Sequence, residues 1–186
     1  KSAWWHAFSK KKISKAKIVS ALSEQEANYL RNMGIKRPIS IVPNGFEFSK
    51  KIAIIPNEIQ IDKPYILFLG YLDPRKQPEF LVEVFAKARI KSSHKLVLAG
   101  PDAYGHRQVI ENIADTYGVS NQVVFTGSVY GNDKLNLFRN AECVCLPSKG
   151  EGLPVVLIES LGAGTPVVCS EACNFNDIEQ RGAGVC

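Results

Sequence analysis

Two glutamates bracket the start of an expected helix near the carboxyl end of the chain, in "SKGEGLPVVLIESLGAGTPVV" (148–168). Seven residues separate Glu151 from Glu159, and Pro154 between them suits the first position of a helix. At ~1.5 Å per residue they would lie about 12 Å apart along a helix axis, beyond the ~5 to 9.5 Å of paired glycosidase carboxylates. We therefore expect the two carboxylates to bind separate hydroxyl groups of an extended ligand, and not to act as an acid and base pair.

Two adjacent cations form a second candidate site. Arg75 and Lys76 lie in "GYLDPRKQP", directly before a helix that is expected to begin at Pro78. The amides at a helix N-terminus carry partial positive charge, so cations beside them favour an anion, with phosphate as the obvious candidate. The alternative is a pair of solvated surface cations.

The stretch around Glu151 supplies a second anion-binding helix start. If that helix begins at Pro154, the backbone amides of Leu153, Val155 and Val156 face the same ligand. A diphosphate bridging the two helix starts would fit a sugar at one end and a ribose at the other. The alternative is that Glu159 is an ordinary surface residue and Glu151 a favourable charge near a helix N-terminus.

The elements that must position these residues alternate from residue 65 onward. Strands are expected over 65–71, 95–100, 122–127, 142–147 and 166–170, and helices over 78–90, 106–118, 132–141 and from near Pro154. Such alternation indicates βαβ units, and right-handed crossovers then build an α/β fold with a Rossmann-like, doubly wound parallel sheet.

Glycines stand where such a sheet binds ligands. Gly70, Gly100 and Gly127 each close an expected strand, and Gly150 and Gly152 follow the fourth strand. Ligands of open α/β sheets bind outside the carboxyl ends of the strands, where loops approach them closely. Each glycine alone is equally explained by a left-handed turn, but together they favour a ligand cleft.

The chain is expected to divide into three segments. Residues 1–45 read as strand, helix and strand, the helix ending at Gly34, and are interpreted as the tail of an incomplete N-terminal domain. The charged, proline-containing stretch 46–64 is expected to be a linker. Residues 65–186 form the Rossmann-like domain, which we expect to be truncated at its carboxyl end.

Charge and apolar patterning limit the function classes. The net charge is +5, and residues 1–23 hold six Lys and neither Asp nor Glu, which indicates either a solvated helix face or weak contact with an anionic surface. No apolar run approaches the ~20 residues of a membrane span.

The five cysteines lack the paired spacing of a zinc site. Cys143 and Cys145 are interpreted as small hydrophobes on one face of a strand, ahead of metal or disulfide roles. Free thiols of this kind favour a reducing compartment.

These motifs together resemble the retaining glycosyltransferases of the GT-B fold, family four (glycosyl transferases group 1), in their carboxyl-terminal, donor-binding half. "PSKGEGLPVVLIESLGAGTPVV" is similar to that family's Glu, seven residues, Glu motif, and "FLGYLDPRKQPEFLVEVFAKA" is similar to its phosphate loop. "LVLAGP", "VVFTGSVY" and "IVPNG" match its other signposts in the expected order. Many members carry an Arg where this chain has Tyr71, so the cationic role shifts to Arg75.

The resemblance implies a role for each candidate residue. Arg75 and Lys76 would bind the donor diphosphate, and Glu159 the ribose hydroxyls. Glu151, with the backbone of Gly152 and Leu153, would bind the donor sugar. The nucleobase would lie against a loop made of Ser128, Val129 and Tyr130.

The implied activity is hexosyl transfer from a UDP- or GDP-sugar to a glycan or lipid-linked acceptor, with retention of configuration and without a metal cofactor. Polysaccharide or lipopolysaccharide biosynthesis at the cytoplasmic face of a membrane is the implied setting, and nucleic acid is not an expected partner. The chain alone is expected to bind a sugar nucleotide weakly and to transfer little. The alternatives are a non-catalytic nucleotide-binding module and a relative of the sugar-nucleotide epimerases.

Overall fold

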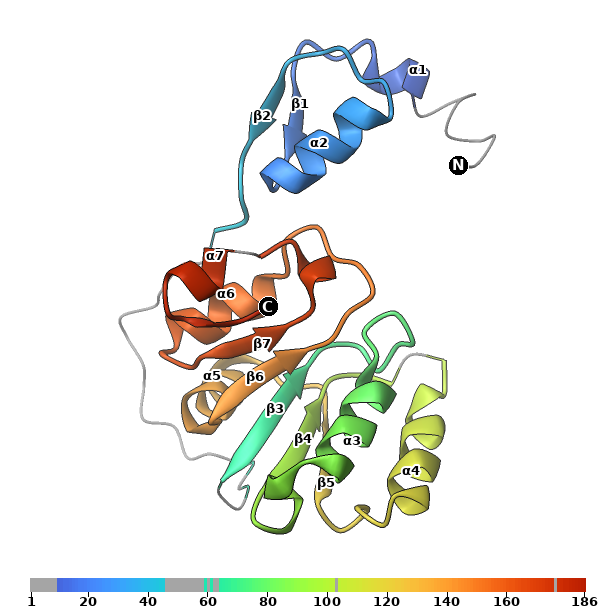
Figure 1. The fold of residues 1–186 in the computed structure, drawn as a ribbon, viewed down its shortest axis with the longest axis vertical. Helices are drawn as coiled ribbons and strands as arrows, with labels where there is room; N and C mark the ends of the chain where they lie inside the picture. The colour runs from blue at the N-terminus through green and yellow to red at the C-terminus, as the bar shows by residue number, and fades with distance from the viewer. Residues whose placement is uncertain (1–9, 46–58, 60, 62–63, 103, 176) are drawn as a thin grey trace. The chain divides into compact units, whose positions relative to one another are not determined.

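The computed structural model describes residues 10–45, 59, 61, 64–102, 104–175 and 177–186 (Figure 1). Its internal contacts divide the chain into two compact units, Lys1–Gly45 and Phe46–Cys186. Most of the predicted linker 46–64, and the first nine residues of the lysine-rich segment, lie outside the described residues. The assignment of these segments to a linker and to an acceptor domain stays a prediction.

The first unit is a small βαβ arrangement. It contains α1 (Lys10–Ile13), β1 (Val19–Ala21), α2 (Glu24–Asn32) and β2 (Ile39–Ile41), and the two strands pair in parallel. Ser23 caps α2 by accepting a hydrogen bond from the Glu26 amide, while Glu26 accepts one from the Leu22 amide at 2.6 Å. Gly34 follows the helix at φ +83°, a left-handed position that glycine adopts readily. The expected strand, helix and strand are thus present, and the helix ends two residues before the predicted end at Gly34.

The second unit is the predicted doubly wound sheet. Its strands are β3 (Tyr65–Leu69), β4 (Lys95–Ala99), β5 (Val123–Gly127), β6 (Cys143–Leu146), β7 (Val167–Cys169) and β8 (Gly184–Val185). All pair in parallel, in the order β5-β4-β3-β6-β7-β8. Counted from β3, this is the Rossmann order 3-2-1-4-5-6. The α/β fold class expected from the sequence is confirmed.

Helices cover both faces of this sheet (Figure 1). They are α3 (Pro78–Lys87), α4 (His106–Thr116), α5 (Gly131–Asn140), α6 (Val155–Gly162) and α7 (Asp177–Gln180), with short 3-10 turns η2 (Arg89–Ser92) and η3 (Glu171–Cys173). The winding reverses after β5, so right-handed crossovers place α3 and α4 on one face and α5 and α6 on the other.

Burial of both sheet faces explains why the strands are apolar throughout. Leu67, Leu96, Leu98 and Val144 are fully buried within the sheet. Tyr65 is buried too, and its hydroxyl donates to the Leu137 carbonyl at 2.8 Å. Burial raises the pKa of Tyr65 to about 12, so the phenol stays protonated as this hydrogen bond requires.

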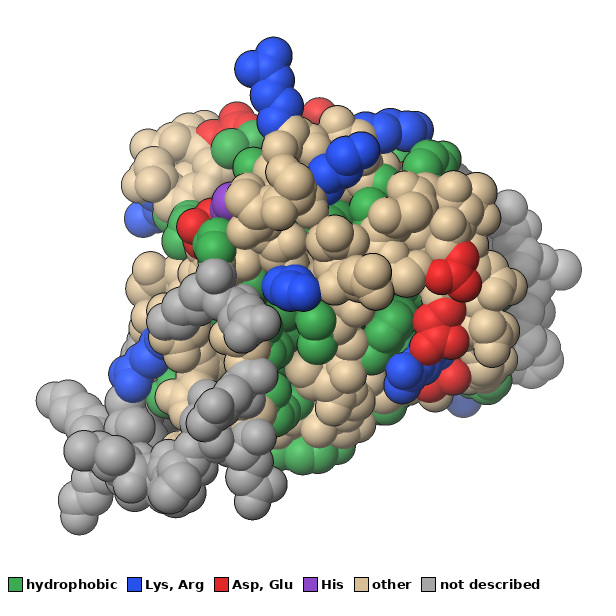
Figure 2. Space-filling model, turned by 90° about the horizontal axis from the view of Figure 1, so that it is seen from below, with side chains coloured by type: hydrophobic (Ala, Val, Ile, Leu, Met, Phe, Trp, Pro, Cys, Tyr) green, Lys and Arg blue, Asp and Glu red, His purple; other side chains and the backbone are tan. Residues whose placement is uncertain are grey.

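Basic, acidic and hydrophobic side chains are interspersed on the face of the molecule shown in Figure 2. Lys and Arg side chains are scattered over the face shown in Figure 2 and do not gather into one continuous patch among the residues coloured there. Every helix in the described part of the chain is too short or too polar to cross a bilayer.

Candidate functional site

The candidate residues lie around the point where the strand order of the sheet reverses. β3 and β6 are neighbours, whereas their successors β4 and β7 pair on opposite sides of them. The loops that leave β3 and β6 therefore open side by side, and the Lys149 amide donates to the Arg75 carbonyl at 2.7 Å across them. Ligands of open α/β sheets bind at this crevice.

Two glycines allow the strand ends to meet closely. A Cβ atom on Gly100 would stand 1.8 Å from the carbonyl oxygen of Gly70, and Gly100 has a φ of +143°. The Gly70 amide donates to Ala99, and the Gly100 amide to Gly127. Gly100 is therefore required by backbone packing, whether or not it also contacts a ligand. Gly127, at φ +71°, has open space where a Cβ would lie and needs glycine for its turn alone.

Lys76 and Glu151 form an ion pair across the crevice. The Lys76 Nζ lies 2.6 Å from the Glu151 Oε1, and the two side chains are 23% and 17% exposed. The Ser148 hydroxyl donates to the same oxygen at 2.8 Å. From the sequence, Lys76 is expected to bind a diphosphate and Glu151 a sugar, and the structure brings these two residues into direct contact.

The turn that holds Glu151 is supported from a later loop. The Glu151 amide donates to the Ala172 carbonyl at 2.8 Å, and the Asn174 side-chain amide donates to the Glu151 carbonyl at 2.5 Å. Asn174 has a φ of 54°, a left-handed conformation that asparagine tolerates better than most residues. Sequence reasoning missed Asn174, because its partner lies 23 positions earlier.

Arg75 is exposed and is held by Asp73. Its Nε and Nη2 donate to the two carboxylate oxygens of Asp73 at 3.1 and 3.2 Å, although the Arg75 side chain is 83% exposed. The Arg75 amide also donates to Asp73 at 2.7 Å. Hydrogen bonds from the Arg75 side chain, then from its amide, lower the pKa of Asp73, and the same side-chain contact raises the pKa of Arg75. Asp73 was also missed, although an Asp in a turn commonly accepts a hydrogen bond from the backbone amide two residues later, as in an Asx turn.

The helix after this loop begins where the sequence predicted. α3 starts at Pro78, and Gln77 before it has a φ of 55° and makes no side-chain cap. A left-handed residue here explains why Asn or Gly suits this position better than glutamine.

The helix after β6 begins one residue later than predicted. Pro154 has an extended ψ of 118° and is the N-cap, so α6 starts at Val155. Since Glu151 precedes the helix, the separation of about 12 Å expected for two helical residues does not apply to it. Gly152 and Val155 are exposed at this helix start, whereas Leu153 is buried.

Glu159 forms an ion pair with a different lysine, Lys134, which is not among the residues predicted from the sequence. The Lys134 Nζ lies 2.5 Å from the Glu159 Oε1, and the side chains are 31% and 13% exposed. Glu159 is thus not an ordinary solvated residue of the helix surface. Lys134 lies 25 positions earlier, on a separate helix, and no local sequence signal links the two.

The predicted base loop follows β5. Ser128 and Tyr130 are exposed and Val129 is buried. Ser128 lines a cavity of about 270 Å³ together with Gly100, Asp102, Arg107 and other residues. Within the described part of the chain, no hydrogen bond or ion pair joins the base loop to Arg75, Lys76 or Glu151.

Comparison with known proteins assigns this geometry to a family. The family model "Glycosyl transferases group 1" matches residues 49–186. The chain belongs to this family. An uncharacterized glycosyltransferase of Methanocaldococcus jannaschii is 35% identical over 120 residues, which are 64% of this chain and 30% of that protein.

Solved glycosyltransferase structures share the fold of this group 1 chain. WaaG, described as a glycosyltransferase involved in lipopolysaccharide biosynthesis, superposes with a TM-score of 0.74 and 23% identity over 89% of this chain and 48% of its own. Anabaena HepE in complex with UDP and glucose superposes with a TM-score of 0.73 and 18% identity, over 93% of this chain and 52% of its own. The match to GT-B glycosyltransferase structures confirms the expected fold, and the chain spans about half the length of these two.

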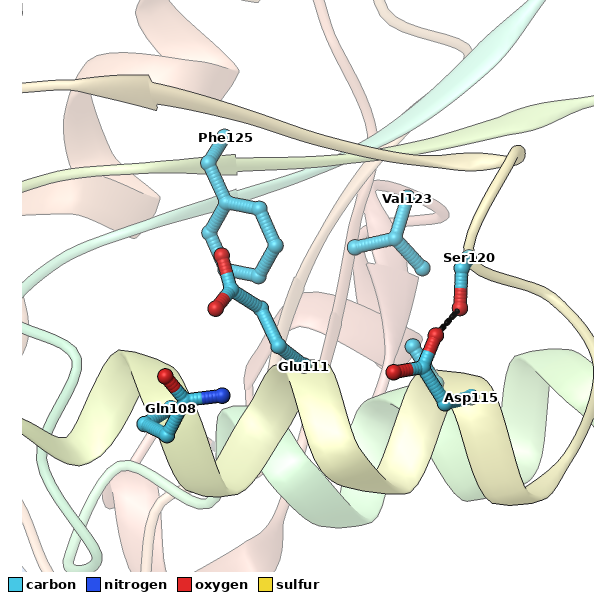
Figure 3. A pocket seen from close by; sticks show the side chains of 7 residues that line it. Gln108, Glu111, Asp115, Ser120, Val123 and Phe125 are labelled. Atoms are coloured by element: carbon cyan, nitrogen blue, oxygen red, sulfur yellow. Dashed lines mark hydrogen bonds between the residues drawn. The ribbon is translucent and has the colours of Figure 1, made fainter.

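The group 1 chain has a further cavity that contains none of the predicted site residues. It measures about 320 Å³ and lies between α4 and the edge strand β5 (Figure 3). Glu111 and Asp115 of α4 face Phe125 and Val123 of β5 across it, and Ser120 hydrogen bonds to Asp115. Glu111 is already paired with Arg107 at 2.7 Å, so this acidic lining is partly neutralised.

The cysteines of this group 1 chain are free thiols, of which Cys145, Cys169 and Cys173 are buried in the apolar core and Cys143 and Cys186 are partly buried against it. The Sγ atoms of Cys143 and Cys145 lie 3.9 Å apart on one face of β6, as the strand pattern predicted. The hydrogen bond that joins Cys145 to Cys143, followed by burial, raises the pKa of the Cys145 thiol and keeps it protonated. Among the described residues, no group of three His, Cys, Asp or Glu side chains is arranged for a metal ion.

Proposed function

We propose that this chain binds the nucleotide-sugar donor of a retaining hexosyltransferase. The observation that carries the proposal is the Lys76–Glu151 ion pair beside the exposed Arg75 guanidinium, at the switch point between β3 and β6. A cation and a carboxylate in contact there give one ligand both a partner for phosphate and an acceptor for sugar hydroxyls. Family membership and the expected motif roles support the same assignment.

The diphosphate would lie against Arg75 and Lys76. Arg75 is held in place by Asp73 but exposes its guanidinium, so a phosphate can bind it without removing it from a buried site. The start of α3, with Pro78 at its first position, adds the partial positive charge of a helix N-terminus. These groups would stabilise the charge that develops on the departing nucleoside diphosphate, which is the form of stabilisation that raises a rate.

The rest of the donor would extend to either side. Glu151 and the backbone of Gly152 would contact the sugar, Glu159 the ribose, and the loop of Ser128 and Tyr130 the base. HepE, which shares the fold, has been crystallised with UDP and glucose, which supports a UDP-sugar as the first donor to test, with a GDP-sugar as the second.

The acceptor and the setting are also proposed. A glycan or lipid-linked acceptor at the cytoplasmic face of a membrane fits the lysines at the start of the chain and the involvement of WaaG in lipopolysaccharide biosynthesis. We propose that transfer needs no metal ion, since Arg75, Lys76 and the helix starts supply the positive charge that a metal would otherwise provide.

Calorimetric titration tests the donor site directly. UDP, GDP and ADP, each with and without glucose, are titrated into this chain, its Lys76→Ala variant and its Lys91→Ala variant. Lys91 is exposed in η2, outside the crevice, and serves as the matched control. We expect one nucleotide to bind, Lys76→Ala to weaken it at least tenfold, and Lys91→Ala to leave it unchanged. Failure of all three nucleotides to bind the folded chain would refute the proposal.

Transfer is tested in the full-length protein. Nuclear magnetic resonance of the product anomeric proton distinguishes retention from inversion, and the same assay with a chelator tests metal independence. Nucleotide binding without transfer would favour a non-catalytic module. Conversion of the free nucleotide sugar to its epimer would favour the epimerase alternative.

A further inference from the structure

A lysine at the start of α5 contacts the glutamate that the proposed function assigns to the ribose. Lys134 lies in the first turn of α5, and its amide donates to the carbonyl of Tyr130, the last residue of the predicted base loop, so it lies one helical turn after that loop. Its Nζ reaches Oε1 of Glu159 in α6 at 2.5 Å. We propose that Lys134 is a positioning residue, which orients the Glu159 carboxylate toward the ribose hydroxyls of the donor. This inference rests on the proposed function.

The contact restricts one oxygen and leaves the other accessible. Lys134 binds Oε1, and Oε2 of Glu159 makes no hydrogen bond to the described residues. A ribose offers two adjacent hydroxyl donors, and a carboxylate accepts on both of its oxygens. With the carboxylate rotation fixed before the ligand arrives, less side-chain freedom is lost on binding.

Partial burial of both side chains limits the conformations that the Lys134–Glu159 pair can adopt. The Glu159 side chain is 13% exposed and that of Lys134 is 31% exposed, so neither is free to sample the range of an exposed side chain. α5 and α6 cover the same face of the sheet (Figure 1), and the pair links the helix after the base loop to the helix after the Glu151 turn. Lys134 thereby couples the base and ribose regions of the site.

A purely structural brace between α5 and α6 is the competing explanation. A brace would affect unfolding but would be indifferent to which hydroxyls the ligand carries. The discriminating measurement is therefore the ratio of affinities for a ribonucleotide and its deoxy analogue, because a general loss of stability does not change this ratio.

The experiment titrates UDP, 2′-deoxy-UDP and 3′-deoxy-UDP, or the corresponding GDP or ADP set if that base binds more tightly. Variants are Lys134→Met, Lys134→Arg and Glu159→Gln. Hydrogen bonds to charged groups contribute ~1.5 to 3 kcal/mol, so the wild-type chain is expected to prefer the ribonucleotide by about tenfold or more over at least one analogue. Lys134→Met should reduce this preference toward that of Glu159→Gln, and Lys134→Arg should retain most of it.

A charge-exchanged chain, Lys134→Glu with Glu159→Lys, separates the two explanations. It restores an ion pair between the helices, so its unfolding should approach that of the wild type, yet it should show no ribose preference. It also keeps the test valid if Lys134→Met does not fold.

Two results would overturn the inference: unchanged ribose preference in Lys134→Met, or in the charge-exchanged chain. A wild-type chain that binds no nucleotide would instead refute the proposed function itself.

Discussion

The two lysine–glutamate pairs of the second unit have the same chemistry but different structural settings. Lys76–Glu151 joins two loops at the strand switch point, and Lys134–Glu159 joins two helices on one face of the sheet. Under the proposed function, the first pair lies where charge develops during transfer, and the second lies where the ligand is only bound. Because their settings differ, the two ion pairs are expected to affect different steps. Lys76–Glu151 should affect the rate of transfer, and Lys134–Glu159 should affect the selectivity of binding.

The largest expected effect comes from the backbone that supports the first pair. Gly100→Ala places a Cβ 1.8 Å from the Gly70 carbonyl, at a φ unsuited to alanine, so we expect a loss of about 4 to 5 kcal/mol in the free energy of unfolding. Urea denaturation measures it. Gly105→Ala is the matched control, since Gly105 also has a positive φ but open space around its Cβ position, and should lose only about 1 kcal/mol. Equal losses would show that the close approach of the strand ends is not important.

The next effect separates the two pairs in the proposed transfer reaction. Lys76→Ala should lower kcat about 100- to 1000-fold, or ~2.7 to 4 kcal/mol, because a preorganised cation is lost from the leaving group. Lys134→Met should change kcat far less and act mainly on KM. Steady-state transfer assays of the full-length protein measure both. Equal losses of kcat in the two variants would contradict the division of roles between the pairs.

A smaller effect concerns the left-handed residue before α3; at the start of α5, which carries the lysine of the second pair, the left-handed residue is already a glycine, Gly131, at φ +53°. Gln77→Gly should stabilise the chain by about 1 kcal/mol, because glycine adopts the left-handed φ of 55° without steric cost. Thermal unfolding measures the gain. Gln77→Ala keeps the unfavourable conformation and should show none, and a comparable gain there would contradict this explanation.

The smallest effect is the pH dependence of the loop that carries Arg75. The pKa of Asp73 is lowered in the folded chain, so its contribution to stability is complete above the ordinary carboxyl pKa of ~4 and is lost as the pH falls through the lowered value. Melting curves of the wild type and Asp73→Asn between pH 3 and 6 test this. The wild type should be the more stable near pH 6, and the difference should shrink toward pH 3. A difference that grows on acidification would contradict the assignment.

Much of the fold was predictable because its signals are local. The apolar strands from 65 to 170 and the helices between them carry period and turn signals within a few residues, and Pro78 marked a helix start correctly. β8 was missed, since Gly184 and Val185 form a strand only by pairing with Val167 and Val168. The start of α6 was predicted at Pro154, one residue too early, because proline suits both the N-cap and the first helical position.

The residues of the candidate site also divide into those that the sequence identifies and those that only the structure identifies. Arg75, Lys76, Glu151 and Glu159 were identifiable because each lies in a short motif, next to a helix start or a glycine turn. Their roles as residues that bind a nucleotide sugar stay predictions. Asp73, Lys134 and Asn174 were not identified, since their importance comes from the side chains they contact.

The sequence by itself determined the alternation of strand and helix, the apolar sheet and the motifs at its strand ends, because these depend on neighbours along the chain. Only the tertiary structure decided that Lys76 meets Glu151, that Lys134 meets Glu159, and that Gly100 must lie against Gly70. These contacts join positions 25 to 75 residues apart, and their energies depend on burial and geometry that exist only once the parallel sheet has formed.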